Sequence, residues 1–414
     1  MEKNKKLSEK LQSTLSSSLA NFPYEIRVKD YAGEHYTIGR RQEHWAKKPL
    51  LLSVKTADAA RSVIDTDVLG TLDYFLKDEI DLQGNLYVLS DIQHIHVKAM
   101  LRPWRSFAQY IKNNTFQNIK RAAVNVKSHY DIPQEVINTY LDTRYQSYSC
   151  GIFEDPGQIK QDDLLNSGMG ETDSFDSLEK AQWRKFKDAI DFISPAESDN
   201  MLDVGCGYGG QLQVALQAHR FNKIVGWTLS HNQAVKGNER LSRSFDPSRY
   251  ELNEGDYRKD DRIYDHVMST GMVSHVGPRG LVPYVRNIRK RITRGGRYLH
   301  HALMCSHSPY HLDRFPGAAF NKKYVWPGFH WFTVAEHVRA LEQNGFQIAR
   351  LVNLSPHYAK TCTAWYERFC AHEQEILTHI NLATYRAWQV YLAGAVGGFL
   401  NKKIHVYRIY CVAV

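Results

Sequence analysis

The sequence has no paired cysteines, no long apolar run and no metal-finger spacing. Its six cysteines form no C-x-x-C pair: Cys150, Cys206, Cys305, Cys362, Cys370 and Cys411. This pattern predicts reduced thiols in a cytosolic protein and disfavours a zinc site, so no metal ligand is expected. The opening MEKNKK leads into a polar, Ser-rich segment, which predicts no signal peptide. The longest weakly apolar run, Val390 to Leu400, is about half the roughly 20 residues that a transmembrane helix needs.

What is present is an ordinary globular composition with an excess of positive charge. The chain has 414 residues, of which 43% are hydrophobic and 23% charged, and this predicts two packed domains rather than disorder. The net charge of +9 predicts attraction to a polyanion such as an anionic membrane surface or nucleic acid. A basic soluble protein without such a partner is the alternative. No recognition motif supports nucleic acid, so none is expected as a partner.

The first 122 residues are predicted to form a small α+β domain with a basic linker. Its opening segment places four leucines at steps of four: Leu7, Leu11, Leu15 and Leu19. This stripe could dock on its own domain or on a membrane, and its narrowness favours the first. Short strands are expected at YEIRVKD, HYTIG and LLLSV. The segment Ile92 to Tyr130 has no acidic residue and interleaves seven Lys or Arg residues with aromatics. It is either a patch for anionic headgroups or a solvated linker.

The stretch from Met201 to Val214 has the pattern of a strand, a glycine-rich turn and a helix. Gly205, Gly207 and Gly210 permit a tight turn and close approach of a ligand, and the following helix offers unpaired N–H groups. The loop alone fits both a dinucleotide and S-adenosylmethionine. Asp203 favours the second, because a carboxylate suits a cationic methionine moiety better than a pyrophosphate.

The second strand of this unit ends in GWTLS, without the acidic residue that dinucleotide enzymes use to hold a ribose. Thr228 and Gln233 are left as candidate hydroxyl partners. Strands and helices alternate from Met201 onward, which predicts a doubly wound α/β sheet. A mostly helical insertion is expected after Gly345, and the late strand IHVYRIYCVAV is expected at the edge of the sheet.

Seven blocks in order resemble the cyclopropane fatty acid synthases: HYD (129–131), YSCGIFED (148–155), LDVGCGYGG (202–210), GWTLSHNQ (226–233), GDYR (255–258), HVGP (275–278) and YAKTCTAWYERF (358–369). The resemblance implies a class I, Rossmann-like, seven-stranded methyltransferase domain over residues 123–414 and a lipid-contacting domain over residues 1–122. It implies methyl transfer from S-adenosylmethionine to the double bond of an unsaturated phospholipid acyl chain. The enzyme would be cytoplasmic and peripherally associated with the inner face of the membrane, and a homodimer is left open.

Two other functions compete with this one. One is a small-molecule N- or C-methyltransferase of the same fold, which would need no lipid-docking domain. The other is a lipid-binding homologue that has lost activity.

The resemblance also implies where S-adenosylmethionine would bind. The matching positions contact, in order, its methionine end, the glycine loop, the ribose and the adenine edge: Tyr148 and Ser149, Gly205 and Gly207, Thr228 and Gln233, Asp256 and Tyr257. Asp203 joins this set because of its position before the glycine turn.

In the family a bound bicarbonate serves as base, held by groups that match Cys150, His301, the backbone of Leu303, and Tyr358. A glutamate completes that cage in the block F-E-H-V-G-P, and Ser274 stands in its place here. A serine is shorter and uncharged, so both the bicarbonate and the outcome of the reaction are open: a cyclopropane or a methylated acyl chain.

Methyl transfer to an alkene leaves a carbocation, which aromatic faces can stabilise. Six residues are candidates for this role, most of them expected to be packing: Tyr324, Trp326, Phe329, Trp331, Trp365 and Tyr391. His300 and His301 are adjacent in a predicted strand, so they should point to opposite faces of it.

Overall fold

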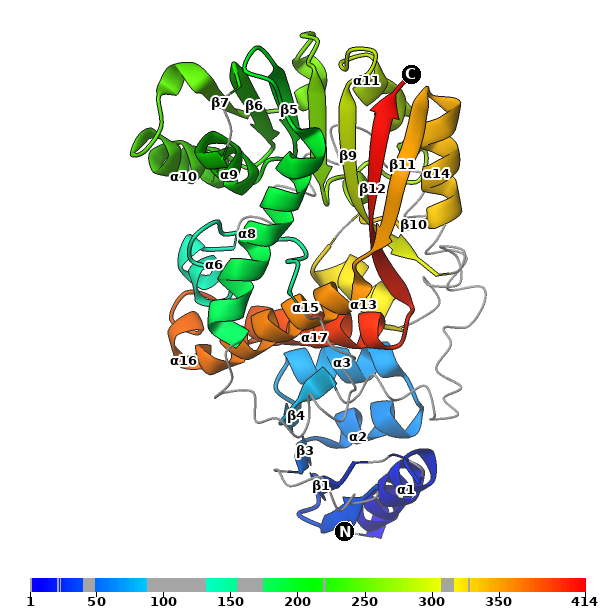
Figure 1. Cartoon of the computed structure of the whole chain (residues 1–414). Helices are drawn as coiled ribbons and strands as arrows, with labels where there is room; N and C mark the ends of the chain where they lie inside the picture. The colour runs from blue at the N-terminus through cyan, green and yellow to red at the C-terminus, as the bar shows by residue number, and fades with distance from the viewer. Residues whose placement is uncertain are drawn as a thin grey trace.

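The computed structural model describes residues 2–20, 22, 24–39, 49–87, 132–154, 174–218, 221–306, 316–326 and 328–414. A small N-terminal sheet and a large C-terminal sheet lie at opposite ends of the molecule, with helices between them (Figure 1). The basic, aromatic segment from Ile92 to Tyr130, the HYD block and the predicted domain boundary after residue 122 lie outside the described residues. The boundary therefore stays a prediction.

The N-terminal part is an α+β unit, as predicted. Its elements are α1 (Glu2–Ser18), β1 (Ile26–Lys29), β2 (His35–Ile38), β3 (Leu50–Val54), α2 (Ala57–Ile64), α3 (Val68–Leu76) and β4 (Ile80–Gln83). The sheet order is β2-β1-β3-β4, with β1 and β3 parallel and the other pairs antiparallel. Thr56 and Asp67 cap α2 and α3 through side-chain bonds from backbone N–H groups, which fixes where each helix begins.

The leucine stripe of α1 docks on its own domain, as predicted. Leu11, Leu15 and Leu19 are buried in a core shared with β1 and α2, and α1 packs against α2. Tyr31 adds a hydrogen bond from its hydroxyl to the carbonyl of Asn4 at 2.7 Å. The leucine stripe therefore packs inside the N-terminal part of the protein.

The large sheet is doubly wound, as predicted. Its strands are β5 (Asn200–Val204), β6 (Lys223–Thr228), β7 (Tyr250–Glu254), β8 (His266–Thr270), β9 (Arg297–Cys305), β10 (Phe332–Thr333), β11 (Phe346–Asn353) and β12 (Ile404–Ala413). The order is β11-β12-β9-β8-β5-β6-β7, with β10 paired to β9. The helices that connect or flank these strands are α9 (Gly210–Ala218), α10 (His231–Ser242), α11 (Leu281–Arg289) and α14 (Val334–Gln343). The strands β5 to β9 pair in parallel, while β12 is antiparallel to both of its neighbours.

The prediction that the strand IHVYRIYCVAV lies at the sheet edge was wrong. This strand, β12, lies between β9 and β11, and β11 forms the edge. The physical reason is visible in the burial of side chains: most of β11 is exposed, whereas the residues from Arg408 to Cys411 are all buried. Such a run is typical of a strand that is covered on both faces.

Half of the helices between the two sheets belong to the insertion predicted after Gly345, and the others come from earlier in the chain. They are α6 (Gln134–Tyr140), α8 (Ser174–Ile193), α13 (Pro316–Tyr324), α15 (Ser355–Ala371), α16 (Glu373–Ile376) and α17 (Leu382–Leu400). One contiguous apolar core joins N-terminal residues such as Phe75 and Leu86 to Trp365 and Trp388 on α15 and α17. The N-terminal sheet and the insertion are thus packed together.

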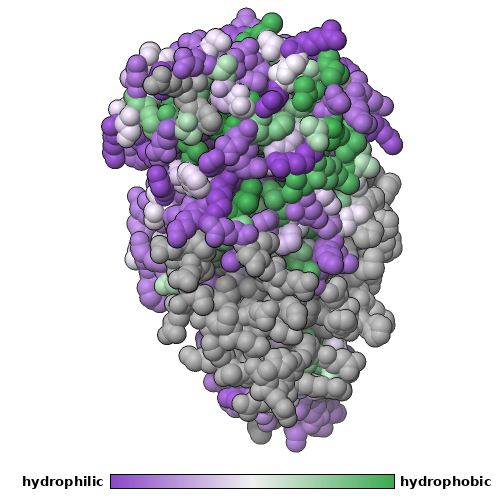
Figure 2. Space-filling view, in the orientation of Figure 1, coloured by the Kyte–Doolittle hydropathy of each residue, from purple (hydrophilic) through white to green (hydrophobic). Residues whose placement is uncertain are grey.

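Large apolar side chains on the described surface are scattered over different elements. Leu51 lies on β3, Trp183 on α8 and Leu351 on β11. In the view of Figure 2, hydrophilic residues surround a smaller band of apolar ones in the described part of the surface. Scattered residues of this kind are normal and do not by themselves assign a membrane-facing side.

Arg386 on α17 is the principal polar link to the N-terminal part. Its guanidinium donates to the carbonyls of Phe75 (2.6 Å) and Ile80 (3.3 Å) and to the carboxylates of Asp78 and Asp81 (both 2.8 Å). We expect Arg386→Met to lower the free energy of unfolding by about 2 kcal/mol, because it removes four hydrogen bonds made by a buried guanidinium. Urea unfolding measures this.

The matched control is Lys323→Met. Lys323 on α13 also reaches the N-terminal part, through Asp73 at 3.0 Å, but this pair is largely exposed. We expect a change within about 0.5 kcal/mol for it. Equal effects of the two substitutions would contradict the importance of the buried link.

Candidate active site

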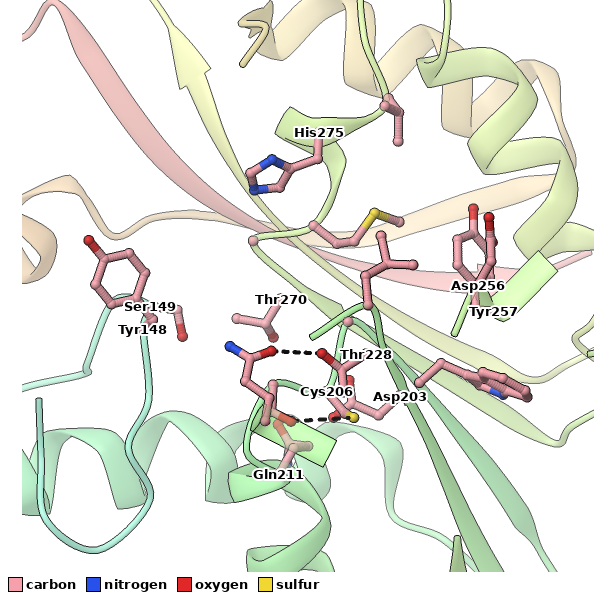
Figure 3. A pocket seen from close by; sticks show the side chains of 18 of the residues that line it. Tyr148, Ser149, Asp203, Cys206, Gln211, Thr228, Asp256, Tyr257, Thr270 and His275 are labelled. Atoms are coloured by element: carbon pink, nitrogen blue, oxygen red, sulfur yellow. Dashed lines mark hydrogen bonds between the residues drawn. The ribbon is translucent and has the colours of Figure 1, made fainter. Parts of the chain in front are cut away.

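A pocket of about 940 Å³ lies at the carboxyl ends of β5, β6, β7 and β8 (Figure 3). This is where open α/β sheets bind their ligands. All nine residues predicted to bind the cofactor line it: Tyr148, Ser149, Asp203, Gly205, Gly207, Thr228, Gln233, Asp256 and Tyr257. These nine residues lie on separate elements between positions 148 and 257, and the fold brings them together around one pocket.

The glycine-rich turn adopts the left-handed backbone that glycine favours. Gly205, Gly207 and Gly209 have φ values of +80°, +55° and +77°. A Cβ on Gly205 would also lie 3.1 Å from the side chain of Met272, so the turn is closely packed there. Gly210 instead begins α9, and a Cβ on it would lie 2.8 Å from an aromatic ring of α8. The third left-handed glycine is therefore Gly209, where the sequence had suggested Gly210.

Asp203 places a buried carboxyl group against the pocket. Burial raises its pKa to about 7, and the nearby charge of Lys185 opposes this rise. An ionised carboxylate in such a place is costly unless a positive charge accompanies it. The site therefore fits a ligand with a cationic group at this end.

The pocket has two chemically different ends. Asp256 and Tyr257 lie on the side opposite to Tyr148 and Ser149 (Figure 3). Asp256 caps the short helix η3 (Tyr257–Lys259) and accepts hydrogen bonds from Arg258 Nε at 2.8 and 3.0 Å. Burial raises the pKa of Asp256, but these bonds outweigh it and leave the pKa lowered. Between the ends, Thr228 donates to Gln233 at 2.7 Å, so the two predicted ribose partners are already paired.

Ser149 is held by two residues of α8 that the sequence interpretation missed. The Lys185 ammonium donates to the Ser149 hydroxyl at 2.8 Å and to Gln182 Oε1 at 2.5 Å. Gln182 in turn donates to the Ser149 carbonyl at 2.9 Å. Burial lowers the pKa of Lys185 to about 7. The available signal was the spacing of three between Gln182 and Lys185, which puts both on one face of a helix.

An aromatic cluster, defined as Tyr148, Trp326, Trp365, Trp388 and Tyr391, extends from the pocket into the helical insertion. The ring of Tyr148 stacks on that of Trp365 at 4.9 Å and lies 5.8 Å from that of Trp326. Its hydroxyl donates to the Tyr391 hydroxyl at 3.3 Å. Three of the six candidate aromatics thus adjoin the pocket wall.

Of the remaining three candidates, Phe329 also adjoins the pocket wall, because its neighbour His275 lines the pocket. Phe329 packs against His275 and Trp331, with ring centroids 5.8 and 4.7 Å apart. Tyr324 is 36% exposed and hydrogen-bonded to Asp73 of the N-terminal part. This position does not suit contact with a buried substrate.

The five residues predicted to form the base site do not line this pocket. Cys150 and Tyr358 are buried in one apolar core against which Leu303 packs, and His301 is buried two residues before Leu303 on β9. The Cys150 thiol points to the carbonyl of Leu354 at 3.7 Å, and Leu354 also accepts the backbone N–H of Tyr358. Leu303 pairs with Val406, whose carbonyl accepts the N–H of Leu354.

Ser274, the fifth residue, lies in the short helix η4 (Val273–His275), which packs against β9. Its side chain is buried, and its hydroxyl has no hydrogen-bond partner among the described residues. His301 Nε2 is in the same condition. The catalytic roles of the five residues stay predictions, and two of these residues have a buried polar atom without a partner among the described residues.

The two adjacent histidines point to opposite faces of β9, as predicted. His300 contacts Tyr298 and His337 on the α14 side, through ring nitrogens at 2.8 and 2.9 Å. His301 instead meets Arg408 on β12, near Lys185 of α8. Only His301 can therefore belong to the base site.

The model of the mycolic acid cyclopropane synthetase family matches residues 117–409 of the chain. The chain belongs to this family. It is 27% identical over 293 residues to a "Probable fatty acid methyltransferase" of Pseudomonas putida, covering 69% of this chain and 68% of the relative. It is 26% identical to the "Cyclopropane-fatty-acyl-phospholipid synthase" of Escherichia coli K12, covering 71% and 69%. The match thus spans about two thirds of each of these relatives.

Solved structures agree with the fold of this family. The structure of mycolic acid cyclopropane synthase CmaA1 complexed with SAH and CTAB has a TM-score of 0.61 at 25% identity, covering 70% of this chain and 98% of that one. Coclaurine N-methyltransferase has a TM-score of 0.60 at 13% identity, which shows a shared fold only. The predicted methyltransferase fold class is therefore confirmed.

Further pocket residues escaped the sequence interpretation. Some lie inside the matched blocks and others lie beside a block or near a strand end, and they include Tyr208, Gln211, Trp227, Thr270, Met272 and His275. Burial lowers the pKa of His275 to about 4, so it faces the pocket as a neutral imidazole. Its place directly after Ser274 was the available signal.

All six cysteines of the protein are free thiols. Within the described ranges, no three His, Cys, Asp or Glu side chains gather as a metal site would require. No helix in the described part of the chain is both long and apolar enough to cross a bilayer.

Proposed function

We propose that this member of the cyclopropane synthetase family transfers the methyl group of S-adenosylmethionine to the double bond of an unsaturated acyl chain in a phospholipid. The family match and relatives named for fatty acyl and phospholipid substrates support the reaction class. The product is either a cyclopropane or a methylated chain. We further propose that the enzyme works peripherally at the inner face of the membrane, in keeping with the net charge of +9.

One observation carries the proposal: at one end of the pocket, an aromatic cluster packs directly behind the lining residue Tyr148. Tyr148 stacks on Trp365, which is 1% exposed. An isolated alkene is a poor nucleophile, so its reaction needs water excluded and the partners aligned. An aromatic surround satisfies the first need and suits a positive charge that develops on carbon.

The residues of the pocket fit S-adenosylmethionine, which when bound supplies an electrophilic methyl group on a sulfonium. Asp203 offers a carboxylate to the positive charge of its methionine end, and the left-handed turn from Gly205 lets the backbone approach it. Lys185 and Gln182 hold Ser149 in place through both its hydroxyl and its carbonyl. Tyr148, which lines the pocket, would stabilise a nearby cation by about 1 to 2 kcal/mol when desolvated, and Trp365 holds its ring in place by stacking.

The base site fits bicarbonate only in part. His301 Nε2 and Ser274 Oγ are buried without partners in the described residues, so they can bond to an anion. Ser274 has no charge with which to raise the basicity of such an anion, as a glutamate would. We therefore propose that proton removal is slower here than with a glutamate and that some product forms without ring closure.

The test is incubation of the protein with S-adenosylmethionine and vesicles of monounsaturated phospholipid, followed by mass spectrometry of the acyl chains. We expect a gain of one CH2 per modified chain. Hydrogenation distinguishes the products, because it reduces an alkene and spares a ring under mild conditions. Retained cofactor binding without any mass gain would instead indicate a lipid-binding homologue that has lost activity.

Ser274→Glu is expected to raise the cyclopropane fraction of the product. The glutamate restores a carboxylate beside the base site, which favours loss of the proton from the new methyl group. Ser274→Gln is the matched control, since it has the same length without the charge. An unchanged product ratio in Ser274→Glu, or an equal shift in both variants, would refute this role of the position.

A further inference from the structure

Arg408 is a fully buried arginine in the middle of the large sheet. It lies on β12 opposite His301 of β9 in the antiparallel register, so the two side chains share one face. Its Nη1 donates to the Asp188 carboxylate at 2.5 Å and to the Lys185 carbonyl at 3.0 Å. Its Nε points to Nδ1 of His301 at 3.4 Å. Two anchors on α8 thus fix the guanidinium against the imidazole.

The contact determines which nitrogen of His301 carries the hydrogen. A guanidinium has only donors and does not lose a proton in proteins. Nδ1 of His301 must therefore accept, so in the neutral ring the hydrogen resides on Nε2. Nε2 is the atom left without a partner among the described residues.

The charges around His301 keep the ring neutral. The charge of Arg408 on β12 and that of Lys185 on α8 both act on the imidazole of His301, and His300 is its neighbour on β9. The nearby carboxylate of Asp188 accepts a hydrogen bond from Arg408. Burial first, and then the charges of Arg408 and Lys185, hold the pKa of His301 well below its usual range. A second proton on the ring would sit against an arginine in a buried position.

We infer that Arg408 is a positioning residue that fixes His301 as the neutral tautomer with its hydrogen on Nε2. His301 then acts at the base site as a hydrogen-bond donor and not as the proton acceptor, since Arg408 engages its one lone pair. The catalytic part of this inference rests on the function proposed above. The tautomer does not, because it is a property of the protein alone.

The test is a long-range proton–nitrogen correlation spectrum of protein that contains isotope-labelled histidine. His301 is one of 19 histidines, and its signals are assigned by their loss in His301→Gln. We expect wild-type His301 to show the Nε2–H pattern and no titration down to about pH 5.5. A wild-type spectrum with the hydrogen on Nδ1, or a His301 that titrates near its usual pKa of about 6.5, would overturn the inference.

Two variants locate the cause. Arg408→Met removes both donor and charge, and we expect a mixture of the two tautomers. Arg408→Lys keeps a charge without the planar Nε donor, so we expect mixed tautomers but still no protonation. An unchanged His301 spectrum in Arg408→Met would overturn the assignment to Arg408. If Arg408→Met does not fold, the wild-type spectrum still tests whether His301 carries its hydrogen on Nε2.

Arg350→Met is the matched control. Arg350 belongs to the same ion-pair network through Asp188 at 3.3 Å, and packs on the ring of Tyr410. It lies on β11, which β12 separates from β9, so the His301 spectrum should stay as in the wild type. A change as large as that in Arg408→Met would mean that the network as a whole sets the tautomer, which contradicts a specific role of Arg408.

Activity provides the second readout. With the phospholipid assay, Arg408→Met should lower kcat by about 10-fold or more while KM for S-adenosylmethionine stays within about 2-fold, as for other partners that orient a functional imidazole. Normal kcat in a variant with mixed tautomers would overturn the catalytic part of the inference. If the wild-type enzyme methylated no phospholipid in the assay, the proposed function would be contradicted. The conclusion about the His301 tautomer would not be affected.

Discussion

Asp203→Asn is expected to weaken binding of S-adenosylmethionine by about 100-fold at about pH 8, where the wild-type carboxylate is ionised. The carboxylate lies against the pocket in a buried position, and the ligand that fits there carries a positive charge. A factor of 100 corresponds to about 2.7 kcal/mol, which lies within the range for removal of one member of a buried charge pair.

The pH dependence of binding follows from the same group. Burial raises the pKa of Asp203 to about 7. The cation favours the ionised form, so wild-type affinity should decline as the pH falls from about 8 to about 6. Asp203→Asn cannot ionise and should lose most of this decline. Isothermal titration at several pH values measures both effects.

Without cofactor, the stability of the protein should depend on pH in the opposite direction from cofactor affinity. A folded pKa of about 7 lies above the value of about 3.9 expected in the unfolded chain. The folded state therefore binds this proton more tightly, and the contribution of Asp203 to stability is lost as the pH rises from about 4 to about 7. Cofactor binding should offset this loss. Asp261→Asn, at an exposed aspartate outside the pocket, is the control and should alter neither profile.

Trp365→Ala is expected to lower the free energy of unfolding by about 3 to 5 kcal/mol, the usual cost of removing a large buried aromatic side chain. Trp365 is 1% exposed and packs against Tyr148 and Tyr358, with centroids 4.9 and 5.8 Å apart. Its loss leaves Tyr148 without its stacking partner, so turnover should fall more than cofactor affinity.

Denaturant unfolding and the lipid assay test this prediction together. Trp183→Ala is the control, since Trp183 on α8 is 40% exposed and should change stability by no more than about 0.5 kcal/mol. Similar decreases in the free energy of unfolding of the two variants would show that Trp365 contributes no more to the stability of the core than an exposed tryptophan. Full turnover in a folded Trp365→Ala protein would contradict the proposed role of the aromatic cluster.

The predicted cofactor site was accessible from the sequence because its signals are local. A glycine turn must follow a strand, and Asp203 lies two residues before Gly205, so their proximity needs no knowledge of distant contacts. The blocks that carry the family resemblance then placed Tyr148, Thr228 and Asp256 around the same turn. All of them line one pocket.

The position of β12 was not accessible in the same way. Its neighbours β9 and β11 are chosen by long-range pairing, and the exposed β11 lacks the apolar alternation that identifies a strand. Misplacing β12 at the edge also concealed Arg408, because a basic residue on an edge strand suggests solvent and not a buried partner for His301. The network of Lys185 and Gln182 was missed for a related reason: a lysine on an amphipathic helix normally faces water.

The central place of β12 also has a consequence for biosynthesis. Arg408 and His301 are 107 positions apart, so β9 emerges during translation well before the strand that covers its side. Until then the growing chain presents an open strand edge next to an unfinished core, which is a hazard for aggregation. Pairing over such a separation also slows folding. We therefore expect the nascent protein to depend on chaperones until β12 has been synthesised and has paired with β9.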